Sequence, residues 1–147
     1  MVTTTVQLCT FMVGDLVFAL EVTRIQEVIL LQQITQVPLA SSVIRGLINL
    51  RGQIVTAVDL RARLGMAPRP HSDELPMNVV IRSDDGLMSL VVDAIGDVIE
   101  VGEDTFETPP STLDPNLKEV VERVCKQPGQ LILVLKPEQA SSASTMG

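Results

Sequence analysis

The chain has 147 residues, of which 46% are hydrophobic, enough for one compact domain or two very small ones. No apolar run reaches the roughly 18 residues of a membrane span and the N-terminus lacks signal-peptide features, so we expect a cytoplasmic protein. A net charge of −7, three Phe and no Trp or Tyr argue against nucleic acid as a partner.

Few residues are available for chemistry. Cys9 and Cys125 are too few for a disulfide scaffold, have no metal-ligand spacing, and are expected to be small buried residues in strands. The single histidine, His71, lies in a proline-rich stretch, which makes it a poor acid or base. We therefore expect no catalytic residue, no metal and no cofactor.

Short runs rich in Val, Ile and Leu, bounded by turn residues, predict an all-β protein with short helices. Four hairpins account for most of the chain, and each has glycine in its turn. They pair Thr5–Val13 with Leu16–Leu20, Gly46–Leu50 with Gln53–Leu60, Met77–Ser83 with Leu87–Val92, and Val120–Lys126 with Gln130–Leu135.

The segments between the hairpins have weaker signals. Glu21–Val28 has the spacing of a short helical turn, and Asp59–Leu64 is a short helix with an aspartate cap and a glycine stop. Asp93 follows a strand and is expected to cap a helix. Residues 67–76 contain three prolines and are a predicted linker, while residues 140–147 are predicted to be disordered.

An internal repeat is visible along the chain. Val43–Val58 aligns with Val120–Leu135 at an offset of 77, with apolar residues over apolar ones and turn over turn. Leu20–Val28 aligns with Leu90–Val98 at an offset of 70. The repeat predicts two similar units of about five strands with a groove between them, and such grooves are favoured binding sites.

We expect a single domain over residues 1–139. Its first barrel would span about 14–66 and its second about 77–135, with strand 5–13 as a candidate for crossing between them. Residues 1–69 carry a net charge of +2 and residues 70–147 one of −9. This asymmetry suits a protein that meets more than one partner, although a solvated acidic face would produce it too.

Two charged residues and one amide are candidate contact residues. Arg51 opens a turn where Asn or Asp would satisfy the sterics, and its guanidinium is well suited to interfaces. The alternative is an ordinary exposed turn cation. Asn49 is expected to cap this turn locally. Glu27 lies on a short polar face, and the alternative to a binding role is that it is simply solvated.

Three blocks, in this order and spacing, resemble the CheW-like family of coupling proteins from bacterial chemosensory arrays. They are RIQEVI (Arg24–Ile29), VIRGLINLRGQIVTAVDLRARLG (Val43–Gly65) and LMSLVVDAIGDVIEV (Leu87–Val101). The middle block is the most specific, and the resemblance covers roughly Val6 to Leu135. It implies two SH3-like five-stranded β barrels packed around a shared hydrophobic core, and no enzymatic activity.

The resemblance also implies partners. CheW-like proteins bridge the cytoplasmic hairpin tips of chemoreceptors to the regulatory domain of the histidine kinase CheA, can form rings with it, and reach the membrane only through the receptors. By motif position, the expected partner-contact residues are Asn49, Leu50, Arg51 and Glu27, with Ile25, Val91 and Val92 as apolar candidates on strands.

The second half departs from the family pattern. Arg123 stands where a glycine is usual, Lys136 stands where an acid is usual, and the C-terminus lacks the usual longer helix. Three alternatives to a chemotaxis adaptor stay open from the sequence. They are an adaptor of a twitching-motility or surface-sensing system, a small groove-binding ligand module or enzyme, and a barrel that binds only itself.

Overall fold

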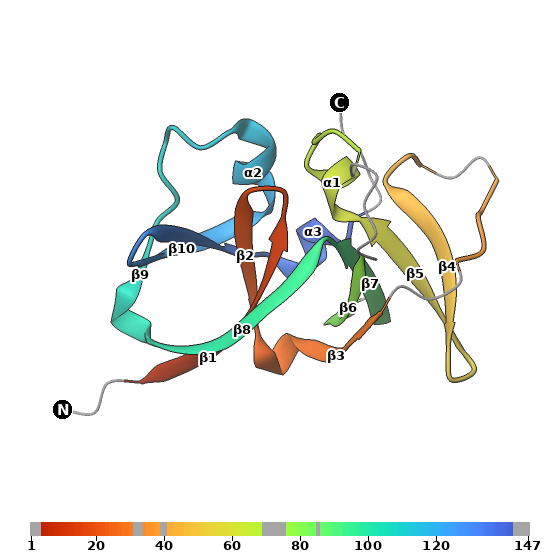
Figure 1. Cartoon of the computed structure of the whole chain (residues 1–147), viewed down its shortest axis with the longest axis horizontal. Coiled ribbons are helices and arrows are strands. Elements are labelled where there is room, and N and C mark those ends of the chain that lie inside the picture. The colour runs from red at the N-terminus through yellow and green to blue at the C-terminus, as the bar shows by residue number, and fades with distance from the viewer. Residues whose placement is uncertain (1–3, 31–33, 39–40, 69–75, 85, 143–147) are drawn as a thin grey trace.

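The computed structural model describes residues 4–30, 34–38, 41–68, 76–84 and 86–142 (Figure 1). Short helices and 3-10 turns connect the strands within these ranges. The strands are β1 (Thr5–Val13), β2 (Leu16–Glu21), β3 (Ile25–Leu30), β4 (Ile44–Leu50), β5 (Gln53–Asp59), β6 (Met77–Ser83), β7 (Gly86–Val92), β8 (Ala94–Gly102), β9 (Phe106–Glu107), β10 (Val121–Gln127) and β11 (Gln130–Leu135). The helical elements are η1 (Val22–Arg24), α1 (Leu60–Arg63), η2 (Glu103–Thr105), α2 (Pro115–Val120) and α3 (Pro137–Ala140).

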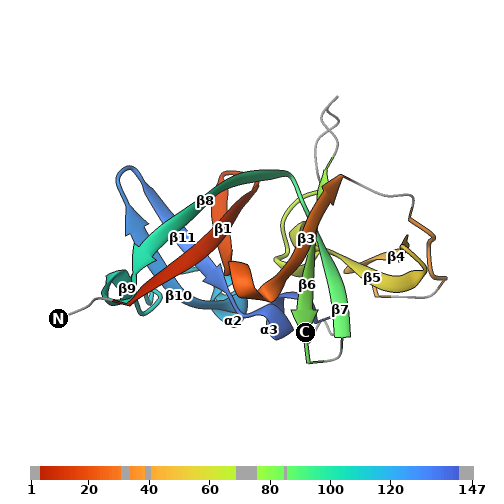
Figure 2. The same cartoon turned by 90° about the horizontal axis from the view of Figure 1, so that it is seen from below.

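The strands form two curved sheets that lie at opposite ends of the molecule (Figures 1 and 2). Sheet A has six strands in the order β8-β1-β2-β11-β10-β9, and sheet B has five in the order β3-β6-β7-β5-β4. The predicted all-β fold of two SH3-like units is confirmed. Sheet A exceeds the expected five strands only by the two-residue strand β9.

The internal repeat is present in the strand pairing. Leu133 pairs with Phe18 in the parallel β11–β2 ladder, and Thr56 pairs with Met88 in the parallel β5–β7 ladder. Leu133 lies 77 residues after Thr56, and Met88 lies 70 residues after Phe18. Both offsets are those of the sequence repeat, so the two sheets share one strand order and one register.

The predicted division into a barrel at 14–66 and one at 77–135 is wrong, because the two halves exchange their first hairpins. The β1–β2 hairpin joins β8, β10 and β11 in sheet A, and the β6–β7 hairpin joins β3, β4 and β5 in sheet B. The chain crosses between sheets twice, through η1 into β3 and through Asp93 into β8. Strand 5–13 itself stays in sheet A.

Several local predictions are corrected. Glu21–Val28 is helical only over η1 and then continues as β3. Asp93 caps no helix, since it joins β7 to β8. The predicted disordered tail is wrong for its first residues, because Ala140 ends α3 and is buried with Ser141, and residues 143–147 of that tail lie outside the described residues. Most of the predicted linker, including His71, lies outside the described residues.

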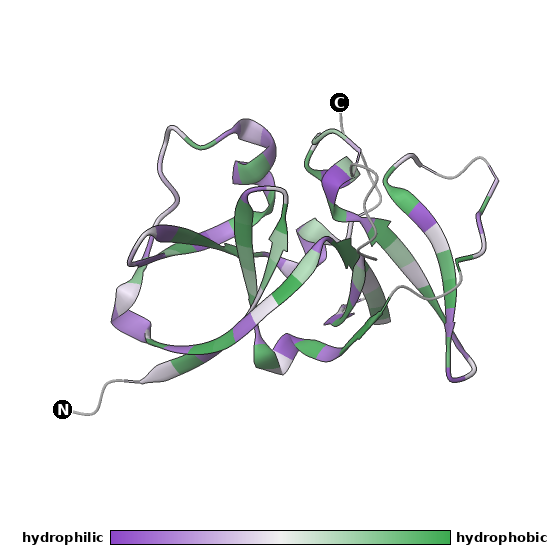
Figure 3. Ribbon diagram, in the orientation of Figure 1, coloured by the Kyte–Doolittle hydropathy of each residue, from purple (hydrophilic) through white to green (hydrophobic). Residues whose placement is uncertain are grey.

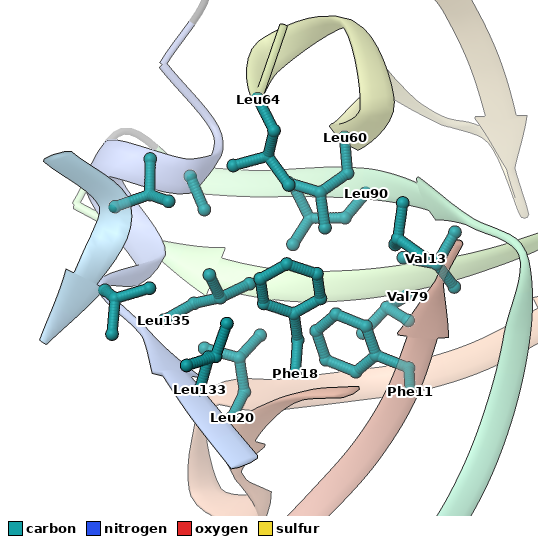
Figure 4. Close-up of a cluster of buried hydrophobic side chains, with 14 of the residues drawn as sticks. Phe11, Val13, Phe18, Leu20, Leu60, Leu64, Val79, Leu90, Leu133 and Leu135 are labelled. Carbon is teal, nitrogen blue, oxygen red and sulfur yellow. The ribbon is translucent and has the colours of Figure 1, made fainter. Parts of the chain in front are cut away.

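A shared core joins the sheets, as predicted (Figure 4). Phe11 and Phe18 of sheet A are fully buried, with ring centroids 6.2 Å apart. They pack in one cluster with Val79 and Leu90 of sheet B and with Leu60 of α1. Burying an aromatic or branched side chain contributes about 1.5–3 kcal/mol each, so this cluster holds the two sheets as one body.

Ion pairs fasten both crossovers. Asp59 caps the start of α1, as predicted. On this helix, Arg61 donates to Asp93 from Nη2 at 2.6 Å and from Nε at 3.1 Å. At the other crossover, Arg24 of η1 pairs with Glu138 of α3. Glu138 lies 77 residues after Arg61, which is the offset of the sequence repeat. The two ion pairs therefore use the same helical position in both halves, with an arginine on α1 and a glutamate on α3.

Arg123 occupies the position in β10 that matches Gly46 of β4, and both follow a register shift in their hairpins. Its guanidinium lies 3.7 Å from the centroid of the Phe106 ring. It also donates to Glu103 at 3.0 Å and to Glu21 at 3.2 Å. The arginine at this position is therefore accommodated by a cation–π contact and two ion pairs.

Candidate protein-interaction site

The tip of the β4–β5 hairpin has an unusual backbone. Arg51 and Gly52 form the two-residue turn with φ of 51° and 88°, the left-handed pattern of a type I′ turn. Arg51 is the one non-glycine residue with positive φ in the described part of the chain. Asn49 Oδ1 accepts from the Gly52 N–H at 2.8 Å, so the predicted local cap is confirmed. An arginine in this conformation costs about 1–2 kcal/mol relative to an ordinary backbone, which argues for a role beyond the turn.

Arg51 and Glu27 lie together although 24 residues separate them. The guanidinium donates from Nη1 to Glu27 Oε2 at 3.1 Å and from Nη2 to Oε1, a bidentate pair. The Arg51 side chain is 68% exposed and that of Glu27 is 23% exposed. The hydrogen bond and the charge of Glu27 raise the pKa of Arg51. Glu27 thus holds the guanidinium in one orientation while three of its five N–H groups are left for other partners.

The remaining candidates from the sequence lie further inside. Leu50 is 8% exposed and packs in the core of sheet B. Ile25 is partly buried against the shared core. Val91 and Val92 are 5% and 1% exposed, which leaves their side chains no surface on which to meet a partner. They act as core residues that support β7.

Sequence reasoning missed one exposed apolar residue at the tip. Ile54 is 62% exposed and pairs with Asn49 across the hairpin. We define Glu27, Asn49, Arg51 and Ile54 as the hairpin-tip surface, and its turn is the strongly hydrophilic end of β4–β5 in Figure 3. An exposed isoleucine beside an oriented arginine is a common composition for a contact with another protein. The signal in the sequence was an apolar residue two positions after the turn glycine, close enough to the end of the hairpin for its side chain to reach solvent.

The described residues show little that supports chemistry. No group of three His, Cys, Asp or Glu side chains among them could hold a metal ion. Both thiols are buried, and burial raises the pKa of Cys9, which disfavours the reactive thiolate. No helix in the described ranges is long and apolar enough to cross a membrane.

Comparison with known proteins decides the family. The family model of the CheW-like domain matches residues 7–144. The chain belongs to the CheW-like family. It is 31% identical to the chemotaxis protein CheW of Bacillus subtilis over 125 residues, which cover 85% of this chain and 80% of that one. It is 26% identical to the chemotaxis protein CheW of Treponema pallidum over 132 residues, covering 88% of this chain and 78% of that one.

The fold agrees with a solved member of the family. The crystal structure of the scaffolding protein TtCheW from Thermoanaerobacter tengcongensis superposes with a TM-score of 0.81 at 28% identity, over 90% of both chains. The CheW-like family is one of scaffold proteins and not of enzymes. The predicted family, fold and absence of enzymatic activity are therefore confirmed.

Proposed function

We propose that this protein is an adaptor that couples the cytoplasmic tips of chemoreceptors to a CheA-type histidine kinase in a chemosensory array. Membership of the CheW-like family over residues 7–144 supports the proposal, as do relatives that are themselves chemotaxis proteins. In this proposal the protein lies in the cytoplasm at membrane receptor arrays. It also joins rings with the kinase regulatory domain or other CheW-like domains.

The observation that carries a binding role is the oriented Arg51 at the hairpin tip. Arg51 has a left-handed backbone, Glu27 orients its guanidinium, and the exposed Ile54 lies on the same hairpin. A fixed side chain loses little conformational entropy when a partner docks, so more of its contact energy appears as affinity. We therefore assign partner contact to the hairpin-tip surface, with Leu50 as its buried support in the core of sheet B.

The adaptor would act through geometry. Two curved sheets joined by one core form a stiff body, so a partner bound at one surface is held at a high effective concentration near another. Receptor signals could then reach the kinase only if receptor states differ in their affinity for the adaptor or in how they hold it.

Arg51→Glu tests this assignment. The side chain is mostly exposed, so the fold should persist, while affinity for a kinase regulatory domain or a receptor tip should fall by about tenfold or more. Lys126→Glu is the matched control, because its side chain is 71% exposed and it reverses a charge on sheet A. Binding is measured by isothermal titration with circular dichroism as the check on folding.

A double variant separates contact from positioning. Arg51→Glu with Glu27→Arg restores an ion pair within the protein but exchanges the two charges. If Arg51 touches the partner, the double variant stays weak. Unchanged binding of the Arg51→Glu single variant would return Arg51 to the role of a turn residue and remove the assignment.

A further inference from the structure

Strand β1 has one edge without a neighbouring strand at its beginning. Its pairing with β8 starts at Thr5, opposite Gly102, whereas its pairing with β2 starts only at Leu8, opposite Glu21. The chain leaves sheet A at Glu21, because η1 carries it into β3 of the other sheet. Among the described residues, no backbone hydrogen bond joins η1 to residues 5–7. Alternate N–H and C=O groups of this segment therefore face an open edge.

The other sheet lacks this feature, although the repeat makes the two sheets equivalent. The residue of β6 that matches Gln7 is Met77, which pairs with Leu30 of β3 on one side and with Val92 of β7 on the other. Among the described residues, the position of Gln7 is therefore open on one edge in sheet A and paired on both edges in sheet B. This difference arises because β1 begins earlier than β6 relative to the repeat and β2 ends earlier than β7.

A groove of about 480 Å³ lies along the open edge. It is lined by residues 5–7 of β1, Glu21 of β2, Val22 and Thr23 of η1, and Glu100 of β8. Glu100 is exposed and makes no ion pair with any described residue. The side chain of Glu21 is 40% exposed, and its Oε1 forms an ion pair with Arg123, which does not line the groove.

The lining is suited to an extended, basic chain. Of the described residues, no Lys or Arg side chain lines the groove, and the two charged residues that do are both acids. Natural proteins commonly protect an open strand edge with lysine or proline, whereas Thr5, Val6 and Gln7 do not. An added strand would satisfy the open backbone groups. Gln7 pairs with Glu100 and Leu8 pairs with Glu21, so the two acids lie on opposite faces of sheet A, and alternate side chains of the added strand on the Gln7 face would reach Glu100.

We propose that an extended segment of a partner protein, carrying Lys or Arg at alternate positions, adds to sheet A as a strand beside Thr5–Gln7. Backbone hydrogen bonds to β1 provide most of the affinity. Glu100 selects basic side chains over acidic ones. This groove shares no residue with the hairpin-tip surface, so the inference does not depend on the proposed coupling function.

A fluorescein-labelled Lys-Val-Lys-Val-Lys peptide with blocked ends is the probe. Fluorescence anisotropy at low salt measures binding to the full chain, and amide chemical shifts locate it. We expect the largest shift changes at residues 5–7 and Thr23. A peptide with alternate amides N-methylated should bind at least tenfold more weakly, because it keeps the charges but loses backbone donors. The corresponding Glu-Val-Glu-Val-Glu peptide should not bind.

Protein variants test the acids. Glu100→Lys should lower the affinity for the labelled peptide about fivefold. The effect is modest because exposed charge pairs are individually weak, although the charge reversal turns attraction into repulsion. Asp104→Lys is the matched control, since Asp104 is exposed on η2 and does not line the groove. Equal binding of the N-methylated peptide, shift changes elsewhere, or equal effects of the two variants would overturn the proposal. Arg51→Glu should leave probe binding unchanged, so this test and that of the coupling function fail separately.

Discussion

Replacing Asp93 by alanine should be among the most destabilising changes of a polar residue in this chain. Its carboxylate accepts from the Gly14 N–H at 2.7 Å and from Arg61 at 2.6 and 3.1 Å. These contacts tie the β1–β2 turn and helix α1 to the crossover between the sheets. The Arg61 side chain is 14% exposed and that of Asp93 is 20% exposed, so water replaces the lost contacts only in part.

The magnitude follows from these contacts. A hydrogen bond to a charged group contributes about 1.5–3 kcal/mol when it is well shielded, and partial exposure lowers the sum of the three. Arg61 also keeps its bond to the Ala67 carbonyl oxygen at 3.0 Å. We expect Asp93→Ala to lower the free energy of unfolding by about 3 kcal/mol. Asp93→Asn, which can still accept from Gly14, should lower it by about 1–2 kcal/mol.

Urea titration followed by far-UV circular dichroism measures both values, and an unchanged m-value shows that the two-state comparison holds. Glu107→Ala is the control. Its ion pair with Lys126 spans 3.5 Å between side chains that are 53% and 71% exposed, so the loss should stay below about 0.5 kcal/mol. If Asp93→Ala costs no more than this control, the crossover clamp contributes nothing and the reasoning is refuted.

Three further predictions concern the hairpin tip, a close backbone approach and pH. Arg51→Gly should leave the stability close to that of the parent, because relief of the left-handed backbone offsets the lost pair with Glu27. Partner binding should fall as for Arg51→Glu, and thermal melts and titration calorimetry check both expectations. Gly46→Ala should destabilise by about 2–4 kcal/mol, because its Cβ would lie 2.4 Å from a backbone carbonyl oxygen, and a urea midpoint within error of the parent would contradict it. Burial raises the pKa of Glu138, but its backbone hydrogen bond and Arg24 lower it further, to below its ordinary 4.5. Because the pKa of Glu138 is lower in the folded state, the stability from the Arg24–Glu138 pair is present above about pH 4.5 and is lost as the pH falls through the folded pKa. In thermal melts from pH 6 to 3, the melting temperature of Glu138→Gln should therefore fall less than that of the parent.

Local structure was predictable because local chemistry determines it. The four hairpins follow from glycine-containing turns between apolar runs, and the cap of α1 follows from Asp59. The repeat was visible because both halves bury the same positions. The exchange of hairpins between the two halves could not be predicted from the sequence. Strand β2 pairs with β11 more than a hundred residues away, and both halves have equivalent apolar patterns, so either pairing fits the sequence.

The site was predictable only in part, for a related reason. Arg51 stood out because a turn does not need an arginine, and its pairing with Glu27 required the fold. Val91 and Val92 belong to a continuous apolar run, in which periodicity cannot distinguish the buried face from an exposed one, and both are buried. In the sequence, Ile54 does not differ from other apolar strand residues, and it is exposed because it lies near the end of the hairpin.

Simultaneous binding of two partners tests the central claim most directly. The full chain is mixed with a soluble receptor-tip fragment and a CheA regulatory domain, and the complexes are separated by size exclusion with light scattering. The adaptor account predicts one complex that contains all three proteins and is lost with Arg51→Glu but not with Lys126→Glu. Binding of neither partner, or binding of one only by displacement of the other, would contradict it.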